Sequence, residues 1–144
     1  MEGESAEYVK PPRRIGRSVG ALAAGFLVNV ALSLATDLAL STVGILPSIG
    51  HGVMNDRQSL LAASYRTLYG VISSWVVARL APYAPVGHAL TGGAFGMALA
   101  TAGAISTWNL GLGPHWYSLS LVATALPSAW AGGKLGAMRG AAAG

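Results

Sequence analysis

Residues 80–133 read LAPYAPVGHALTGGAFGMALATAGAISTWNLGLGPHWYSLSLVATALPSAWAGG, and this stretch contains no Asp, Glu, Lys or Arg. A helix that crosses a bilayer needs about 20 mostly apolar residues, so the stretch is long enough for two spans and a turn. Over the whole chain of 144 residues only 10% are charged, whereas a soluble domain usually carries about 25%. The sequence therefore predicts that water is not the solvent of this segment.

Apolar periods and turn residues divide the chain into four helices. Within the uncharged stretch, helices are expected at about 86–108 and 115–135, joined by a glycine-rich loop. Before it, residues 18–43 form an apolar segment too long for the core of a cleaved signal peptide. Asn55 and Gln58 have the spacing of a capping box and start a helix at about 56–80.

These helices predict an all-α, polytopic membrane protein, a single four-transmembrane-helix bundle over residues 16–137. Residues 1–15 are expected to form a disordered cytosolic tail. Residues 138–144 are expected to form a frayed end.

The basic residues predict the orientation of the bundle. Cytoplasmic segments of membrane proteins carry an excess of Lys and Arg. With the N-terminus inside, seven basic residues fall on the cytoplasmic side and two, Arg57 and Arg66, fall toward the other face. Both termini are therefore expected to be cytoplasmic. The seven are Lys10, Arg13, Arg14, Arg17, Arg79, Lys134 and Arg139.

Small residues at four-residue spacing predict where the helices pack. In lipid, helices associate where small side chains let their backbones approach. Three of the expected helices carry such pairs, and the same faces could instead join two protomers or another membrane protein. The pairs are Gly16 and Gly20, Gly92 and Gly96, and Gly132 and Gly136.

One polar stripe stands out on the first helix. Asn29, Ser33, Asp37 and Ser41 recur every four residues, so they share a helix face. Asp37 is the only acid within an apolar segment, and an ionisable group there normally faces a partner or a cavity. Counted from Arg17, it lies about 30 Å along the helix.

Arg66 of the second helix lies at a matching depth. We therefore predict an Asp37–Arg66 ion pair, with Tyr65 or Tyr69 hydrogen-bonding nearby. Three interpretations remain open: a structural clasp between the two helices, an ion- or proton-responsive carboxylate, or an anion site on Arg66.

The remaining polar and aromatic residues are expected near the membrane surfaces. Aromatic side chains favour both interfaces and long basic side chains extend to the headgroups. Arg79, His88 and Lys134 are placed at the inner side, and Trp108, Trp116 and Tyr117 at the outer side. His51 and His115 also fall on the outer side, where they could meet near Asp56, but no close ligand spacing predicts a metal site.

Catalytic patterns are absent from the sequence. There is no cysteine, no H-E-x-x-H, no G-x-S-x-G and no phosphate-binding loop, so neither an enzyme nor a cofactor is expected. The basic residues flank apolar segments rather than forming a stripe, so the expected partner is membrane lipid and not nucleic acid.

Several segments resemble a group of small four-helix bacterial inner-membrane proteins with no assigned activity. The resemblance covers about residues 18–135 and implies a bacterial inner membrane, but no site residue. The segments that carry it are AASYRTLYG at 62–70, ARLAP at 78–82, PVGHA at 85–89, GPHWY at 113–117 and PSAWAGGKL at 127–135.

Two functions are therefore weighed. The first is an accessory or structural subunit, or a self-associating bundle, that works as a homo-oligomer or within a larger membrane complex. The alternative is a small oligomeric transporter or channel that uses Asp37 as its responsive carboxylate.

Overall fold

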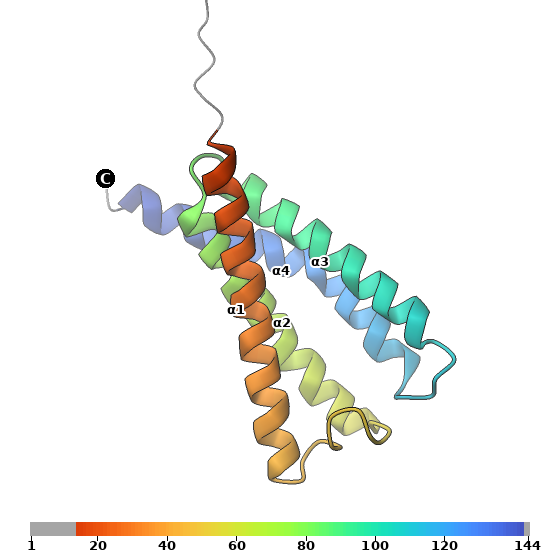
Figure 1. The fold of residues 1–144 in the computed structure, drawn as a ribbon. Coiled ribbons are helices and arrows are strands. Elements are labelled where there is room, and N and C mark those ends of the chain that lie inside the picture. The colour runs from red at the N-terminus through yellow and green to blue at the C-terminus, as the bar shows by residue number, and fades with distance from the viewer. Residues whose placement is uncertain (1–13, 143–144) are drawn as a thin grey trace, which may run out of the picture.

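The computed structural model describes residues 14–142, which form four α-helices and no strand. The helices are α1 (Ile15–Thr42), α2 (Asp56–Leu80), α3 (Pro85–Thr107) and α4 (His115–Ala142), and Figure 1 shows them in chain order. The sequence predicted all four, and α2 has the predicted bounds. The expected tail lies outside the described residues up to position 13, while α1 already includes Ile15. α4 continues through residues 138–142, where the sequence predicted a frayed end.

Local chemistry explains where α1 ends and α2 begins. Gly44, at φ 75°, follows the last turn of α1 in the left-handed conformation that glycine adopts without a steric cost. At the start of α2 the predicted capping box is present: the Asn55 side chain accepts from the Gln58 backbone N–H, and the Gln58 side chain accepts from the Asn55 N–H. Gln58 also donates to the Ile45 carbonyl at 2.7 Å, which ties the loop to α2.

α2 lies at the centre of the bundle. It packs against the other three helices, and its contact with α4 is the most extensive. α3 packs along α4, whereas α1 packs on α2, touches α3 at few positions and does not contact α4. α1 therefore stands at the edge of the bundle, and Figure 1 shows it diverging from α3 toward the loop that joins α1 to α2.

Glycines allow α4 to lie against α2. A Cβ at Gly132 would collide with the Val71 carbonyl of α2, and one at Gly136 would lie 2.6 Å from Ala78 Cβ. The predicted packing role of these two glycines is therefore confirmed. Two pairings that the sequence did not single out work in the same way, Gly25 of α1 against Val77 and Gly93 of α3 against Ala129 of α4.

Three of the predicted packing glycines make no close helix contact. A Cβ at Gly16, Gly20 or Gly96 would meet nothing within 4 Å, and one at Gly92 would make only an ordinary contact with Leu22. Spacing alone failed because it identifies a small-residue face without saying whether another helix covers it. The first two lie on the exposed N-terminal part of α1, where no other helix covers them.

The distribution of side-chain sizes is the reverse of that in a soluble protein. The buried hydrophobic residues of the described chain are mostly alanines, such as Ala21, Ala62, Ala89 and Ala129, each at most 2% exposed. Large apolar side chains point outward instead; Ile105 is 72% exposed and Leu27 is 64% exposed. In water-soluble proteins such residues are those most often buried.

Two of the four helices, α1 and α3, are long and apolar enough to cross a membrane by length and composition. In each, only 11% of the most apolar window is buried, which is unlike the core helix of a soluble protein. α2 and α4 fail the same test of apolarity, and they carry the charged residues Asp56, Arg66, Arg79 and Lys134.

The α2–α4 contact provides a first prediction. We expect Gly132→Ala to lower the free energy of unfolding by about 1–3 kcal/mol, because the added methyl group would press on the backbone of α2. Gly140→Ala on the same helix is the matched control, since a Cβ there meets nothing within 4 Å. Unfolding by sodium dodecyl sulfate in mixed micelles measures both. Equal stabilities of the two variants would contradict the close approach.

Candidate functional site

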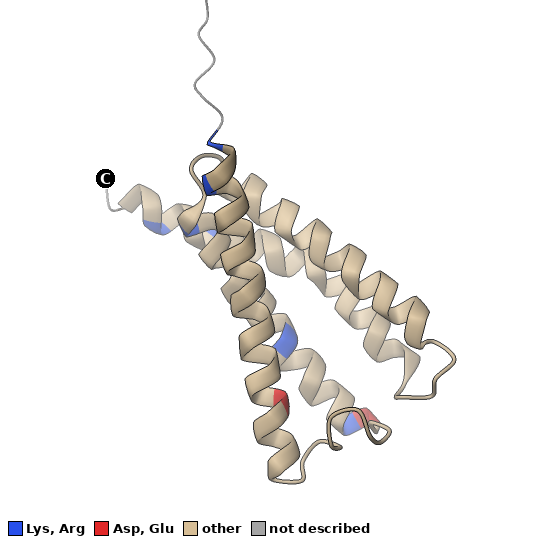
Figure 2. Ribbon diagram, viewed as in Figure 1, with Lys and Arg blue, Asp and Glu red and all other residues tan. Residues whose placement is uncertain are grey.

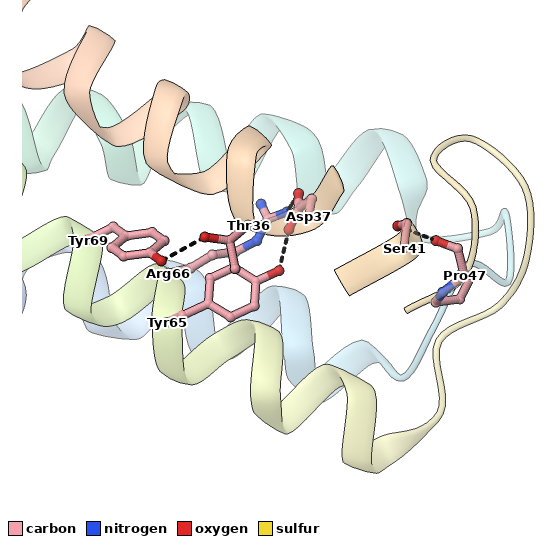
Figure 3. A network of polar contacts seen from close by, with 7 residues as sticks. All are labelled: Thr36, Asp37, Ser41, Pro47, Tyr65, Arg66 and Tyr69. Atoms are coloured by element: carbon pink, nitrogen blue, oxygen red, sulfur yellow. Dashed lines mark hydrogen bonds and ion pairs between the residues drawn. The ribbon is translucent and has the colours of Figure 1, made fainter. Parts of the chain in front are cut away.

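Asp37 of α1 is engaged by two side chains of α2. Arg66 Nη2 donates to Asp37 Oδ2 at 2.5 Å, and the Tyr65 hydroxyl donates to Asp37 Oδ1. Figure 3 shows the two partners reaching across the α1–α2 interface to one carboxylate. The Asp37 side chain is 17% exposed and that of Arg66 is 34% exposed, so the pair is largely removed from solvent. The ion pair predicted from matching depths is present, with Tyr65 as its hydrogen-bonding neighbour.

Two further hydrogen bonds flank the pair. Thr36 shares a hydrogen bond of 2.7 Å with the hydroxyl of Tyr69, about one turn along α2 from Tyr65. Ser41 donates to the Pro47 carbonyl at 2.9 Å and holds the loop that follows α1 (Figure 3). The C-terminal half of α1 is therefore attached to α2 and to its own loop by polar groups.

Two hollows meet at Arg66. The first, which we call the outer pocket, has a volume of about 290 Å³ and lies between Asp37, Ser41, Tyr65 and the loop at 46–54. The second, the central cleft, has a volume of about 620 Å³ and is lined by all four helices. Arg66 lines both, whereas Asp37 lines only the outer pocket. The ion pair thus lies at the boundary between the two hollows, and Arg66 is the member that also lines the cleft.

The central cleft is mostly apolar, with a few polar side chains. Asn29 and Ser33, the other members of the predicted stripe, line it, and the buried atoms Asn29 Oδ1 and Arg66 Nε have no hydrogen-bond partner among the described residues. Its remaining polar residues are Thr67, Ser73, Ser74, Thr91, Thr124 and Ser128.

Sequence reasoning missed the polar residues that α2 and α4 contribute to the cleft. A signal was available, because Ser120, Thr124 and Ser128 recur every four residues and so share one face of α4. Thr67 of α2 donates to Thr124 across the interface at 3.4 Å. Neither hydroxyl suggests a site alone, and only the packing of α2 against α4 places them beside Arg66.

The chain was compared with known families and structures. No protein-family model, curated protein or solved structure matches it.

The predicted interface residues divide between the two ends of the bundle. At the end where α1 begins, His88 Nε2 lies 2.9 Å from Ser18 Oγ, and Arg79 and Lys134 lie over the rings of Trp75 and Trp130. His88 thus contacts α1, whereas Arg79 and Lys134 each contact a tryptophan of their own helix.

The other end holds the remaining aromatic residues. Trp116 Nε1 donates to Asp56 at 2.8 Å and joins the first turns of α4 and α2. Trp108 stacks on His115, with ring centroids 4.2 Å apart, and Tyr117 is half-buried within electrostatic range of Arg66.

The outer histidines do not form a metal centre in the described chain. His115 contacts Trp108, since His115 Nε2 lies 2.9 Å from the Trp108 carbonyl oxygen. His51 lines the outer pocket. Asp56 accepts from Trp116 rather than facing either histidine as a ligand. Within residues 14–142 no three His, Cys, Asp or Glu side chains gather closely enough to hold a metal ion.

The ion pair provides a second prediction. Asp37→Asn and Arg66→Gln are each expected to cost about 1–3 kcal/mol, because each leaves a half-buried polar partner unsatisfied. The double variant should lose less than the sum of the two single losses, since it leaves no unpaired charge. Denaturant unfolding in mixed micelles measures this double-mutant cycle. Strictly additive losses would show that the two side chains do not interact.

Proposed function

We propose that the chain is an integral membrane protein of four spanning helices. The single observation that supports this most strongly is the inverted packing: alanine, glycine and serine fill the interior, while leucines and isoleucines cover the outside. In water this arrangement would expose a large apolar surface, which monomeric soluble proteins rarely do. In a bilayer it is favourable, because small residues allow close helix contacts and large ones face lipid.

The charges support an orientation with both termini in the cytoplasm. Figure 2 shows most of the basic residues of the described chain toward the end where α1 begins, while Arg57 and Arg66 belong to the part of α2 away from that end. Arg14, Arg17, Arg79, Lys134 and Arg139 belong to the segments at that end, and an excess of basic residues favours the cytoplasmic side. The resemblance noted above makes the bacterial inner membrane our proposal for its location.

We further propose that the protein serves as a structural or accessory bundle rather than as an enzyme. Both oxygens of Asp37 are engaged, one by Tyr65 and one by Arg66. A carboxylate that carries protons or ions along a path would need access to that path, yet Asp37 does not line the central cleft. The geometry therefore supports a clasp that holds α1 to α2 over the alternative of a transporter with Asp37 as its carrier.

The four-span topology is open to a direct test. The chain has no cysteine, so single-cysteine variants report one position each. A membrane-impermeant maleimide applied to intact cells should label Ser48→Cys and Asn109→Cys, and it should label Tyr83→Cys only after permeabilisation. If α1 and α3 alone crossed the membrane, Tyr83→Cys would be labelled from outside and Asn109→Cys would not.

An accessory role requires association with other chains. We expect the protein, purified in mild detergent, to have a protein mass of at least twice the 14.6 kDa of one chain by light scattering. Gly20→Leu should reduce it, because Gly20 lies on the uncovered part of α1, where a Cβ meets nothing within 4 Å. Gly103→Leu, equally unhindered on α3, is the control. A single chain at all protein concentrations would contradict the proposal.

A further inference from the structure

The central cleft is a hollow between two parts of the bundle that barely touch. α1 meets α3 at few positions and α4 at none, so the space between them is not filled by packing. Phe26 of α1 and Phe95 of α3 stand on facing walls, with ring centroids 6.1 Å apart, and both are exposed on the outer surface. The cleft therefore opens between α1 and α3, the side that would face lipid in a bilayer.

The lining changes character along the length of the cleft. At the end nearer the start of α1, the walls include Val19, Leu22 and Val77 together with the uncharged hydroxyl residues Ser73, Ser74 and Thr91. At the other end Ser33, Arg66, Thr67 and Thr124 come together. From Val19 to Ser33 the cleft follows α1 for about 21 Å at 1.5 Å per residue. The charge of Arg66 suits its end of the cleft to a polar head, and the mostly apolar walls away from it suit a chain of methylene groups.

The charge at the polar end has a direction. Among the described residues, Arg66 is the only ionisable one that lines the central cleft, and the carboxylate that balances it lines the outer pocket. Arg66 Nη2 donates to Asp37, while its Nε has no partner among the described residues. A guanidinium that lines a mostly apolar cleft favours a carboxylate or phosphate as its ligand, because charge-assisted hydrogen bonds are the strongest that it makes.

The volume limits the size of an occupant. At about 30 Å³ for each small group, the volume that a water molecule takes in the liquid, 620 Å³ holds about 20 heavy atoms. A long-chain fatty acid has about that number, whereas a lipid with two acyl chains has more than twice as many. Mostly apolar walls with a few convergent polar groups are also the usual composition of a small-molecule site.

We propose that the central cleft binds a single-chain anionic amphiphile taken from the bilayer, with its acidic head at Arg66 and its chain along Leu22, Phe26 and Phe95. This binding goes beyond the structural role proposed above. In this proposal the ion pair has a second role, because Asp37 holds the Arg66 side chain at the polar end of the cleft.

The experiment uses the full chain in nanodiscs of zwitterionic lipid, with a photoactivatable palmitic acid as the probe. We expect saturable labelling that maps to α1 and α3 and that unlabelled palmitate removes. Hexadecanol, which has the same chain length and no charge, should compete about tenfold less well, because a hydrogen bond to a charged group contributes about 1.5–3 kcal/mol.

A matched pair of variants tests the position of the site. Gly96 lines the cleft and a Cβ there meets nothing within 4 Å, so Gly96→Leu should occupy part of the cleft without displacing a helix. We expect it to weaken palmitate binding about tenfold or more, as overpacking of a well-fitted space does. Gly103→Leu on the same helix lies outside the cleft lining and should bind as the unmodified protein does.

Three results would overturn the proposal. Equal labelling of the Gly96→Leu and Gly103→Leu variants would place the probe outside the cleft. Equal competition by hexadecanol and palmitate would remove the role of Arg66. Stronger competition by a diacyl phosphatidic acid would show that the site takes a two-chain lipid. The last two comparisons use the unmodified chain and do not depend on the folding of any variant.

Discussion

The close approach of α2 and α4 is the constraint on which the other contacts depend. At Gly132 and Gly136 the two backbones lie so near that not even a methyl group would fit. Such contacts matter most in an apolar solvent, where burying leucine gains little and dispersion between well-fitted helices supplies the cohesion. α3 joins this pair in the same way, through Gly93 and Gly133 against Ala129 and Ala89.

α1 is held differently, and its looser attachment creates the hollows. One glycine contact, Gly25 against Val77, fixes the N-terminal half of α1 to α2. The C-terminal half of α1 is held to α2 by two polar interactions. These are the ion pair of Asp37 with Arg66 and the hydrogen bond between Thr36 and Tyr69. Polar bonds between side chains hold helices farther apart than glycine contacts do, since the side chains themselves span the gap. A cleft between α1 and the α3–α4 hairpin follows from that difference.

The ion pair therefore has a structural and a directional consequence. It secures α1, and it also orients a dipole across the wall between the outer pocket and the central cleft. Asp37 and Tyr65 face the outer pocket, and Arg66 reaches the cleft as well. A charged residue in an apolar segment is costly unless it is paired, and here Arg66 pairs with Asp37 and also lines the cleft.

The sequence by itself determined the four helices, the capping box of α2 and the ion pair. These features follow from local or one-dimensional properties that can be read along the chain. They are the length of the uncharged apolar segments, the spacing of Asn55 and Gln58, and the depths of Asp37 and Arg66. Only the tertiary structure decided which small-residue faces are covered: Gly132 and Gly136 meet α2, while Gly16 and Gly20 meet nothing. It also decided that Thr67, Thr124 and Arg66 share one cleft. Both depend on how separate helices cross, and spacing within a single helix carries no information about its neighbour.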